Sequence, residues 1–494
     1  MKKVCSGSVL LVAVLLAAAT SALATPPDLD WADIYGDSLR DVGLWIEEHS
    51  YDGYVVSGYA DFGNTGIYKA FLMRLNSVGD TLWTRTYRDT LRGGAMCVQE
   101  TPDRGYILAG YVAMPTGNID ALFIRTDENG DTLWTSSFDF GEHEYLYRVL
   151  ETPDGGFIAA GFTSSLAPAG STDVLVLKID EDGHGEWKKL CGGPGHNRAY
   201  DICRASDGDY VVCGYSEMGA DRSDVLVMKI DADNGDSLWA KTYGDTTRES
   251  GRSIEMTPDG GFVVVGNRSD YTLDHIFGYL LRTDAAGDSL WSKAYGDTSE
   301  FTSFSGLALT PDHGFICAGY VDTAMAGDSD CYYVKTDQNG DVQWTKAVGK
   351  DAREAVGCVT MTSDLGYASA GYSRDLSGLD YNIFVVKLGE DEAGVDRACE
   401  VPLPGLLAVD GANPFTSSVP VRFEIPATSH VSLAVYDVEG RQVAVLNDAV
   451  KSAGPHSAVW DLRNAGGGPV PSGVYFIKCA AAGRSGVEKV IVLR

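Results

Sequence analysis

The stretch "TPDGGFVVVGN" (residues 257–267) decides the fold, because nearly the same phrase recurs along the chain. It returns as TPDRGYILAGY (101–111), TPDGGFIAAGF (152–162) and TPDHGFICAGY (310–320). Within it, Pro258 presets the backbone of a turn and Gly260 tolerates a positive φ. The apolar run that follows is rich in β-branched residues, which favours a buried strand over a helix. The phrase therefore predicts a tight hairpin that leads into a central strand.

Three landmarks recur with one common period over most of the chain. They are a tryptophan, a glycine that an aromatic residue follows in most units, and a basic residue. The three series keep the same register, with steps of 51 to 53 residues between tryptophans, so seven units of about 52 residues are present. The tryptophans are Trp31, Trp83, Trp134, Trp187, Trp239, Trp291 and Trp344; the glycines are Gly58, Gly110, Gly161, Gly214, Gly266, Gly319 and Gly371; the basic residues are Arg74, Arg125, Lys178, Lys229, Arg282, Lys335 and Lys387.

A period near 52 residues, with four strand-like segments in each unit, suits the blade of a β-propeller. The first tryptophan strand, DWADIYG (30–36), has no unit before it, and the last unit ends after Lys387 without a tryptophan strand. Pairing of the two would close a ring and remove its exposed edges. We therefore predict an all-β chain with a seven-bladed β-propeller over residues 28–390. The tight turns share one face, so we expect any ligand site on the opposite long-loop face or in the channel mouth beneath it.

These units resemble the secreted bacterial repeat propellers, whose units read W-x-K-x-Y-G, T-x-D-G-G-[YF] and K-x-D-x-x-G-D-x-x-W. The resemblance covers all seven units. It implies the fold and leaves the function open, because propellers host enzymes, binders and scaffolds alike.

The N-terminus and the overall charge indicate where the protein works. Lys2 and Lys3 precede an apolar run from Val9 to Ala19, and a small-residue cleavage site ends at Ala24, so residues 1–24 read as a secretory signal peptide. The run is too short to span a membrane, and we expect no transmembrane segment elsewhere. The formal charge of -30 argues against nucleic acid or an anionic membrane surface as partner.

A different pattern begins after an acidic, proline-bearing linker at residues 391–405. Alternating strands with Gly and Pro turns over residues 406–494 predict a small Ig-like β-sandwich. This segment resembles the C-terminal sorting domain of the type IX secretion system and the Ig-like module of flagellar hook-capping proteins. In it Leu462 stands in place of the usual glycine after Trp-Asp, and Thr416 follows "NPF". The landmarks are Asn413, Pro414, Phe415, Tyr436, Asp437, Gly440, Trp460, Asp461, Gly473, Tyr475 and Lys489.

The resemblance implies that the secretion machinery recognises this domain and that the protein is released or attached to the outer-membrane surface. An ordinary Ig-like module that binds a partner is the alternative.

Candidate chemistry is sparse, and we predict neither catalytic nor cofactor-binding residues. The stretch DEDGHG (180–185) resembles a calcium loop through Asp180 and Asp182, but it also stands where each blade places a hairpin turn. Four aspartates stand five residues before a basic landmark; they read either as a carboxylate ring or as strand caps. The basic landmarks themselves are expected to extend over apolar surface. The four aspartates are Asp120, Asp173, Asp224 and Asp330.

Nine cysteines remain once Cys5 is removed with the signal peptide. Cys203 and Cys213 flank a predicted hairpin and could pair, or they are small buried apolar residues like the others.

Together these features predict an exported, non-enzymatic propeller scaffold. It would bind a protein or glycan on its long-loop face, at the cell surface or outside the cell, and its C-terminal domain would direct type IX-like secretion or attachment. The alternative is an extracellular glycan hydrolase or lyase that uses carboxylates at the channel mouth. A quinone-dependent propeller dehydrogenase is the third hypothesis.

Overall fold

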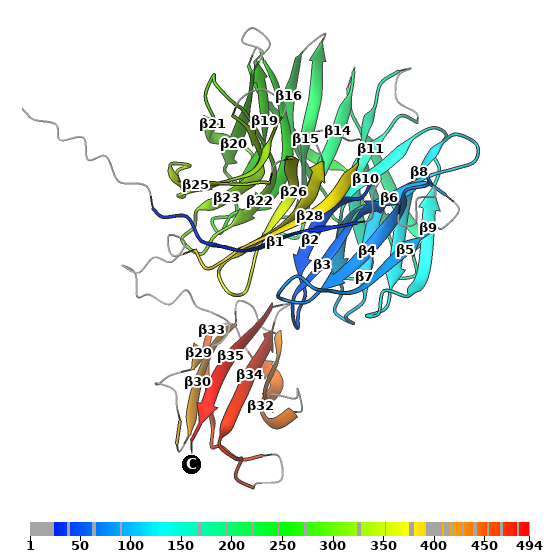
Figure 1. Ribbon diagram of the computed structural model, residues 1–494. Helices are drawn as coiled ribbons and strands as arrows, with labels where there is room; N and C mark the ends of the chain where they lie inside the picture. Colours follow the sequence, from blue (N-terminus) through cyan, green and yellow to red (C-terminus); the bar gives the residue numbers. More distant parts are fainter. Residues whose placement is uncertain are drawn as a thin grey trace, which may run out of the picture. The chain divides into compact units, whose positions relative to one another are not determined.

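The protein divides into two compact units, residues 1–395 and 396–494. The expected signal peptide and most of the expected linker lie outside the described residues. Within the described ranges, no helix is long and apolar enough to cross a membrane. The computed structural model (Figure 1) describes residues 24–36, 40–61, 66–88, 91–165, 170–193, 195–219, 222–245, 247–270, 275–323, 328–350, 352–374 and 380–391 of the first unit, and 408–409, 415–416, 418–425, 429–437, 442–451, 454–464, 468–481 and 484–493 of the second.

The strands of the first unit form seven antiparallel groups of four, which we number as blades 1 to 7. Blade 1 comprises β2 (Val42–Glu48), β3 (Tyr54–Ala60), β4 (Lys69–Leu75) and β5 (Thr81–Tyr87); blade 2, β6 (Gly93–Glu100), β7 (Tyr106–Ala113), β8 (Ile119–Thr126) and β9 (Thr132–Phe138); blade 3, β10 (Glu144–Glu151), β11 (Phe157–Thr163), β12 (Asp173–Ile179) and β13 (Gly185–Cys191); blade 4, β14 (Asn197–Arg204), β15 (Tyr210–Gly219), β16 (Arg222–Ile230) and β17 (Ser237–Tyr243). Blade 5 comprises β18 (Arg248–Met256), β19 (Phe262–Asp270), β20 (His275–Thr283) and β21 (Ser289–Tyr295); blade 6, β22 (Phe301–Leu309), β23 (Phe315–Asp322), β24 (Asp330–Thr336) and β25 (Val342–Val348); blade 7, β26 (Arg353–Met361), β27 (Tyr367–Arg374), β28 (Tyr381–Leu388) and β1 (Leu29–Tyr35).

The blades close into a ring, as Figure 1 shows. The first strand of each blade contacts the first strand of the next, and β26 of the last blade contacts β2 of the first. The first strand of the chain, β1, pairs antiparallel with β28, which places Trp31 opposite Lys387. This pairing supplies the outer strand that the last unit lacks, and it confirms the predicted all-β propeller.

Six of the seven tryptophan landmarks pack against the outer hairpin of the following blade, whereas Trp344 donates its Nε1 to Asp391 at 3.1 Å. A Cβ atom added at Gly130 would lie 2.7 Å from the ring of Trp83, so this turn needs a glycine for contact as well as for its φ of 76°. The hydroxyl of Tyr87 donates to the carbonyl of the same glycine at 3.0 Å, and Arg85 pairs with Asp131 at 3.2 Å. The W-x-[K/R]-x-Y motif is therefore a clamp on the neighbouring blade.

Six of the seven basic landmarks are buried and six are ion-paired, so the expectation that they extend over apolar surface was wrong. The most buried is Lys335, whose side chain is 0% exposed and whose Nζ lies 2.7 Å from Asp312 Oδ2. Burial alone would raise the pKa of Asp312, but the Lys335 charge and hydrogen bonds from its neighbours hold that pKa below its usual value. Arg74 instead donates to the backbone carbonyls of Tyr54 and Asp52. The other pairs are Arg125–Asp103, Lys178–Asp154, Lys229–Asp207, Arg282–Asp259 and Lys387–Asp364.

The second unit is a two-sheet sandwich, which confirms the predicted Ig-like domain. One sheet has the order β29-β30-β33 and the other β32-β31-β34-β35. Phe415, Trp460, Leu462 and Tyr475 pack in its core. The strands are β29 (Ala408–Val409), β30 (Val419–Ile425), β31 (Ser429–Asp437), β32 (Gln442–Lys451), β33 (Gly454–Trp460), β34 (Gly473–Ala481) and β35 (Arg484–Val492).

The buried ion pairs give a direct test of how each blade is held together. Replacing Asp312 by Asn leaves the Lys335 ammonium buried without its counter-charge, and we expect a loss of about 3 kcal/mol in unfolding free energy. Guanidinium chloride unfolding followed by tryptophan fluorescence measures this loss. The matched variant D207N should cost less than half as much, because Lys229 keeps Asp209 at 3.2 Å. Equal losses would contradict the assignment.

Candidate ligand-binding face

Two sets of loops meet at one end of the propeller. They are the connections between the second and third strands of a blade, and those between successive blades. Isolated parallel bridges join the ends of the two sets, pairing Ile119 with His143 and Thr172 with His196. The chain therefore carries its longer loops on one face, as the strand order predicts, and we call this the long-loop face.

Every first strand carries a β-bulge at the same place, where it is one residue longer than its partner. In blade 4, for example, the pairing shifts between Ala199 and Asp201, which leaves Tyr200 as the extra residue. Each of the seven extra residues is partly exposed within a largely buried strand. Bulges re-aim side chains and are common beside functional sites. The seven residues are Leu44, Met96, Tyr147, Tyr200, Arg252, Ser305 and Gly357.

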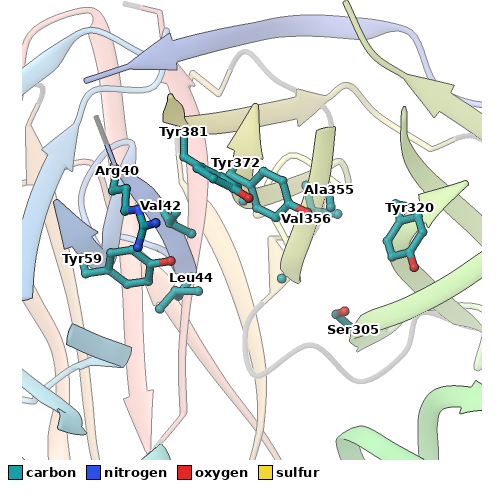
Figure 2. Close-up of a pocket in the computed structure, with 13 residues that line it drawn as sticks. Arg40, Val42, Leu44, Tyr59, Ser305, Tyr320, Ala355, Val356, Tyr372 and Tyr381 are labelled. Atoms are coloured by element: carbon teal, nitrogen blue, oxygen red, sulfur yellow. The ribbon is translucent and has the colours of Figure 1, made fainter. Parts of the chain in front are cut away.

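The bulge residues differ in size around the ring, and this difference opens a cavity. Tyr147 and Tyr200 fill their side, with ring centroids 4.9 Å apart. Ser305 and Gly357 leave space, and a cavity of about 520 Å³ lies beside them at blades 1, 6 and 7. Figure 2 shows its wall, where Tyr372 lies close to Tyr381, Arg40 lies next to Tyr59, and Tyr320 stands across from them.

A second cavity of about 480 Å³ lies at blades 4 to 6 and shares Tyr320 with the first. Arg252 stacks over Tyr200 at 4.3 Å and forms no ion pair in the described part of the chain. Burial raises the pKa of Tyr320, so its hydroxyl stays protonated at neutral pH and can donate a hydrogen bond. We call the lining of both cavities the aromatic–arginine mouth, defined by Arg40, Tyr59, Tyr200, Tyr215, Arg222, Arg248, Arg252, Tyr320, Tyr372 and Tyr381.

Four of the mouth residues belong to the glycine–aromatic landmark, which we used only as a mark of the fold. They are the aromatic residues that follow the landmark glycine in blades 1, 4, 6 and 7. The signal that we missed is a large aromatic ring directly after a glycine in an otherwise buried apolar strand. Packing of the blade core does not require a large ring at this position. The four residues are Tyr59, Tyr215, Tyr320 and Tyr372.

The mouth is locally basic although the whole chain carries a formal charge of -30. Of its two glutamates, Glu217 accepts the backbone N–H of His196 at 2.8 Å, and Glu249 lies 3.6 Å from Arg268. Both carboxylates are therefore engaged within the protein. The ionisable residues of the two cavities, apart from tyrosines, are Arg40, Arg222, Arg248, Arg252, Glu217, Glu249 and His196.

A belt of buried charges crosses the channel between the first strands. Arg148 of blade 3 reaches Glu47 of blade 1 at 3.7 Å and Asp201 of blade 4 at 3.6 Å, and it stacks over Trp45 at 4.0 Å. Burial raises the pKa of Glu255 to about 7; the Asp201 charge adds to this rise and Arg148 opposes it. Glu255 lines neither cavity of the mouth.

The predicted calcium candidates form an ordinary hairpin turn. Asp180 Oδ1 accepts the backbone N–H groups of Asp182 and His184 at 3.0 and 2.8 Å, and these bonds lower the pKa of Asp180. Asp127 accepts two backbone N–H groups in the same way in blade 2. Calcium binding at this turn stays an untested prediction.

The four aspartates before the basic landmarks do not converge on one ring site. Each lies within the first three residues of the third strand of its own blade, at a separate junction between blades. Asp120 and Asp224 are buried, whereas Asp173 and Asp330 are partly exposed.

Cys203 and Cys213 are both buried and both free thiols. The strand pairing places Cys203 opposite Val211 and Cys213 opposite Asp201, so the two do not face each other. The pairing hypothesis was wrong, and the alternative of small buried apolar residues holds for them.

Most of the described landmarks of the Ig-like domain have structural roles. Trp460 Nε1 donates to the carbonyl of Arg463 at 2.9 Å, and the Tyr475 hydroxyl donates to that of Pro471 at 3.0 Å. Leu462 has a φ of 58°, a conformation that favours glycine, which is the usual residue there. Phe415 is buried, Gly473 opens β34, and Tyr436 and Asp437 pair with Phe476 and Tyr475, while Asp461 and Lys489 are exposed; Asn413, Pro414 and Gly440 lie outside the described residues.

Comparison with known proteins finds a similarity for the second unit. The FlgD Ig-like domain model matches residues 410–485. No curated protein matches the chain.

Similar solved structures include the polysaccharide lyase Uly1, with 12% identity, a TM-score of 0.46 and coverage of 72% of this chain and 92% of that one. YCF48 bound to D1 peptide has 14% identity, a TM-score of 0.42 and coverage of 74% and 98%. PorZ, a surface component of the type-IX secretion system of Porphyromonas gingivalis, has 11% identity, a TM-score of 0.34 and coverage of 88% and 65%. Likeness at this level carries no argument about function.

The pKa of Glu255 predicts a pH-dependent stability. The folded protein holds this proton more tightly than the unfolded chain, so a folding penalty grows as pH rises from about 4.5 to about 7 and is constant above. The variant E255Q should match the wild type at pH 4 and exceed its stability by on the order of 1–3 kcal/mol at pH 8. Thermal unfolding across this range measures the difference. The exposed turn variant E128Q should show no such trend, and a constant E255Q difference would contradict the prediction.

Proposed function

We propose that this chain is an exported propeller scaffold whose aromatic–arginine mouth binds an acidic polysaccharide. The observation that carries the proposal is the stacking of Arg252 on the ring of Tyr200, because this guanidinium has no carboxylate partner among the described residues. A guanidinium binds a carboxylate or sulfate group through two parallel hydrogen bonds. A tyrosine ring offers a flat apolar face and a hydroxyl, which suits the two faces and the edge of a sugar ring.

The arrangement of the two cavities supports a polymer as ligand. Each cavity, of about 520 or 480 Å³, has the volume of a small-molecule site, and the two adjoin at Tyr320. A chain of sugars could therefore occupy both in succession. The arginines are distributed over both cavities, with Arg40 in one and Arg252 in the other, which suits a charge repeated along the polymer.

The second part of the proposal concerns export. The basic start and apolar run of residues 1–24 support passage through the inner membrane. The Ig-like fold of the second unit, with the FlgD Ig-like match, is compatible with a sorting domain that the secretion machinery recognises. The ligand would then be met at the cell surface or in the surrounding medium.

The binding proposal predicts selective loss of affinity in one variant. We expect the mature chain to bind polygalacturonate or chondroitin sulfate in calorimetry, and R252A to bind at least tenfold more weakly because one ion pair is lost. The matched control is R85A, which removes an arginine that also lies near a tryptophan ring, 5.5 Å from Trp83, but on an outer strand. Neutral glucans should not bind.

Equal affinity of R252A and wild type would refute the assignment of the mouth. Each polymer is also followed for new reducing ends and for absorbance of unsaturated products, because turnover would favour the hydrolase or lyase hypothesis over a non-enzymatic binder.

The export proposal predicts the location of a shortened chain. In a host with a type IX apparatus, the full-length protein should reach the surface or the medium without its C-terminal domain. A chain ending at residue 395, the boundary of the first unit, should stay in the periplasm. Fractionation and mass spectrometry distinguish the two. If both forms stay periplasmic and uncleaved, the domain is an interaction module and the sorting proposal fails.

A further inference from the structure

A glycine closes the outer strand of most blades and makes room for a carboxylate. A Cβ atom at Gly244 would lie 2.5 Å from Asp224 Oδ1, and one at Gly349 would overlap Asp330 Oδ1. In blades 3, 4 and 6 an aspartate at the start of the third strand therefore packs against this glycine. The residues at this position are Gly36, Arg88, Asp139, Gly192, Gly244, Gly296 and Gly349.

Blade 2 departs from this rule, because Asp139 stands where the glycine is expected. It joins Asp120, the second residue of the third strand of the same blade, and Glu144, which opens the first strand of blade 3. One carboxylate oxygen from each of the three residues lies within 4.8 Å of those from the other two. Asp120 is 4% exposed and Glu144 is buried, whereas Asp139 is exposed. The fold itself has no need of the third carboxylate, since glycine serves five of the other six junctions and Arg88 the sixth.

The protein satisfies two of these carboxylates and leaves the third without a partner. Glu144 Oε1 accepts the hydroxyls of Thr163 and Ser165 at 2.8 and 2.5 Å. Asp139 Oδ1 accepts the backbone N–H of Gly141 at 2.8 Å. Asp120 Oδ1 is buried and has no hydrogen-bond partner among the described residues.

The charged groups nearest to Asp120 are mostly negative. Burial raises the pKa of Asp120, and the charges of Asp139 and Glu144 raise it further. Arg88 is the one cation that opposes this rise, and no ion pair within 4.0 Å joins it to Asp120 in the described residues. A buried carboxylate in such a place requires a proton or a cation.

The junction between blades 4 and 5 shows how the chain neutralises a comparable pair by itself. Asp224 and Glu249 meet there, and both approach the Cβ position of Gly244. Arg222 lies 3.4 Å from Asp224, and Arg268 lies 3.6 Å from Glu249. No arginine takes that place at Asp120 within the described part of blades 2 and 3.

We propose that Asp120, Asp139 and Glu144 form a binding site for a calcium ion at the junction of blades 2 and 3. Calcium takes six to eight oxygen ligands at about 2.3–2.6 Å, so its ligands stand up to about 5 Å apart, which the observed spacing meets. Magnesium requires ligands within about 4.2 Å of one another and a stricter octahedron. Water would complete the shell on the exposed side, at Asp139. The site is separate from the Asp180 turn and does not depend on the function of the mouth.

The test uses the mature protein stripped of divalent ions with a chelator. We expect calorimetry with calcium chloride to give one site, and saturation to raise the Tm by several degrees. The variant D139G restores the glycine of the repeat. It should raise the Tm of the calcium-free protein by relieving repulsion, and it should abolish the calcium-dependent rise. D120N should bind calcium at least tenfold more weakly.

Two controls separate this site from other carboxylates. D224N alters the arginine-neutralised junction and D180N alters the hairpin turn, and both should keep wild-type calcium affinity. The proposal fails if the wild type gives neither heat nor a Tm shift at millimolar calcium. It also fails if D139G retains the shift, or if D180N alone removes it.

Discussion

The propeller depends on a buried cation in the third strand of its blades. In six blades a lysine or arginine reaches from that strand to the aspartate of the hairpin between the first two strands. The cation is the buried partner, since five of the six aspartates are more than half exposed, and leaving such a cation without a counter-charge is costly. A strand register that keeps the hairpin aspartate away from the third strand would leave the cation unpartnered and is therefore disfavoured. Since a one-residue slip would turn every side chain to the opposite face, this constraint protects the whole ring.

Much of the fold could be predicted from the sequence, because chain conformation itself demands the repeated residues. Glycines with positive φ and tryptophans that need a glycine opposite them leave a visible period. The role of Lys335 could not be predicted in the same way, since an exposed and a buried lysine look alike until a partner is placed next to it. The position of its partner Asp312 in a hairpin turn is enough to explain an aspartate there. The sequence therefore does not reveal that Asp312 also forms an ion pair with Lys335.

The candidate site was harder to predict than the fold for a related reason. The extra residue of each first strand is visible only when two strands are paired, because counting along one strand does not reveal a bulge. Arg252 and Ser305 occupy equivalent positions, yet they share no residue type that a repeat search would align. Asp139 likewise stands out only after the structure shows why other blades have a glycine at this position, namely to leave room for a neighbouring carboxylate.

The seven bulges also place residues that can contact a ligand at positions that lie outside the blade cores and the hairpin ion pairs. The seven positions hold six residue types, from glycine to arginine, on backbones of the same geometry. Changes at these positions leave the blade cores and the hairpin ion pairs in place, because neither involves them. Descendants of one ancestral ring could thus diverge in specificity through a handful of codons. Selection for a new ligand would then change the bulge residues that line the channel, while the residues of the blade cores and hairpins stay the same.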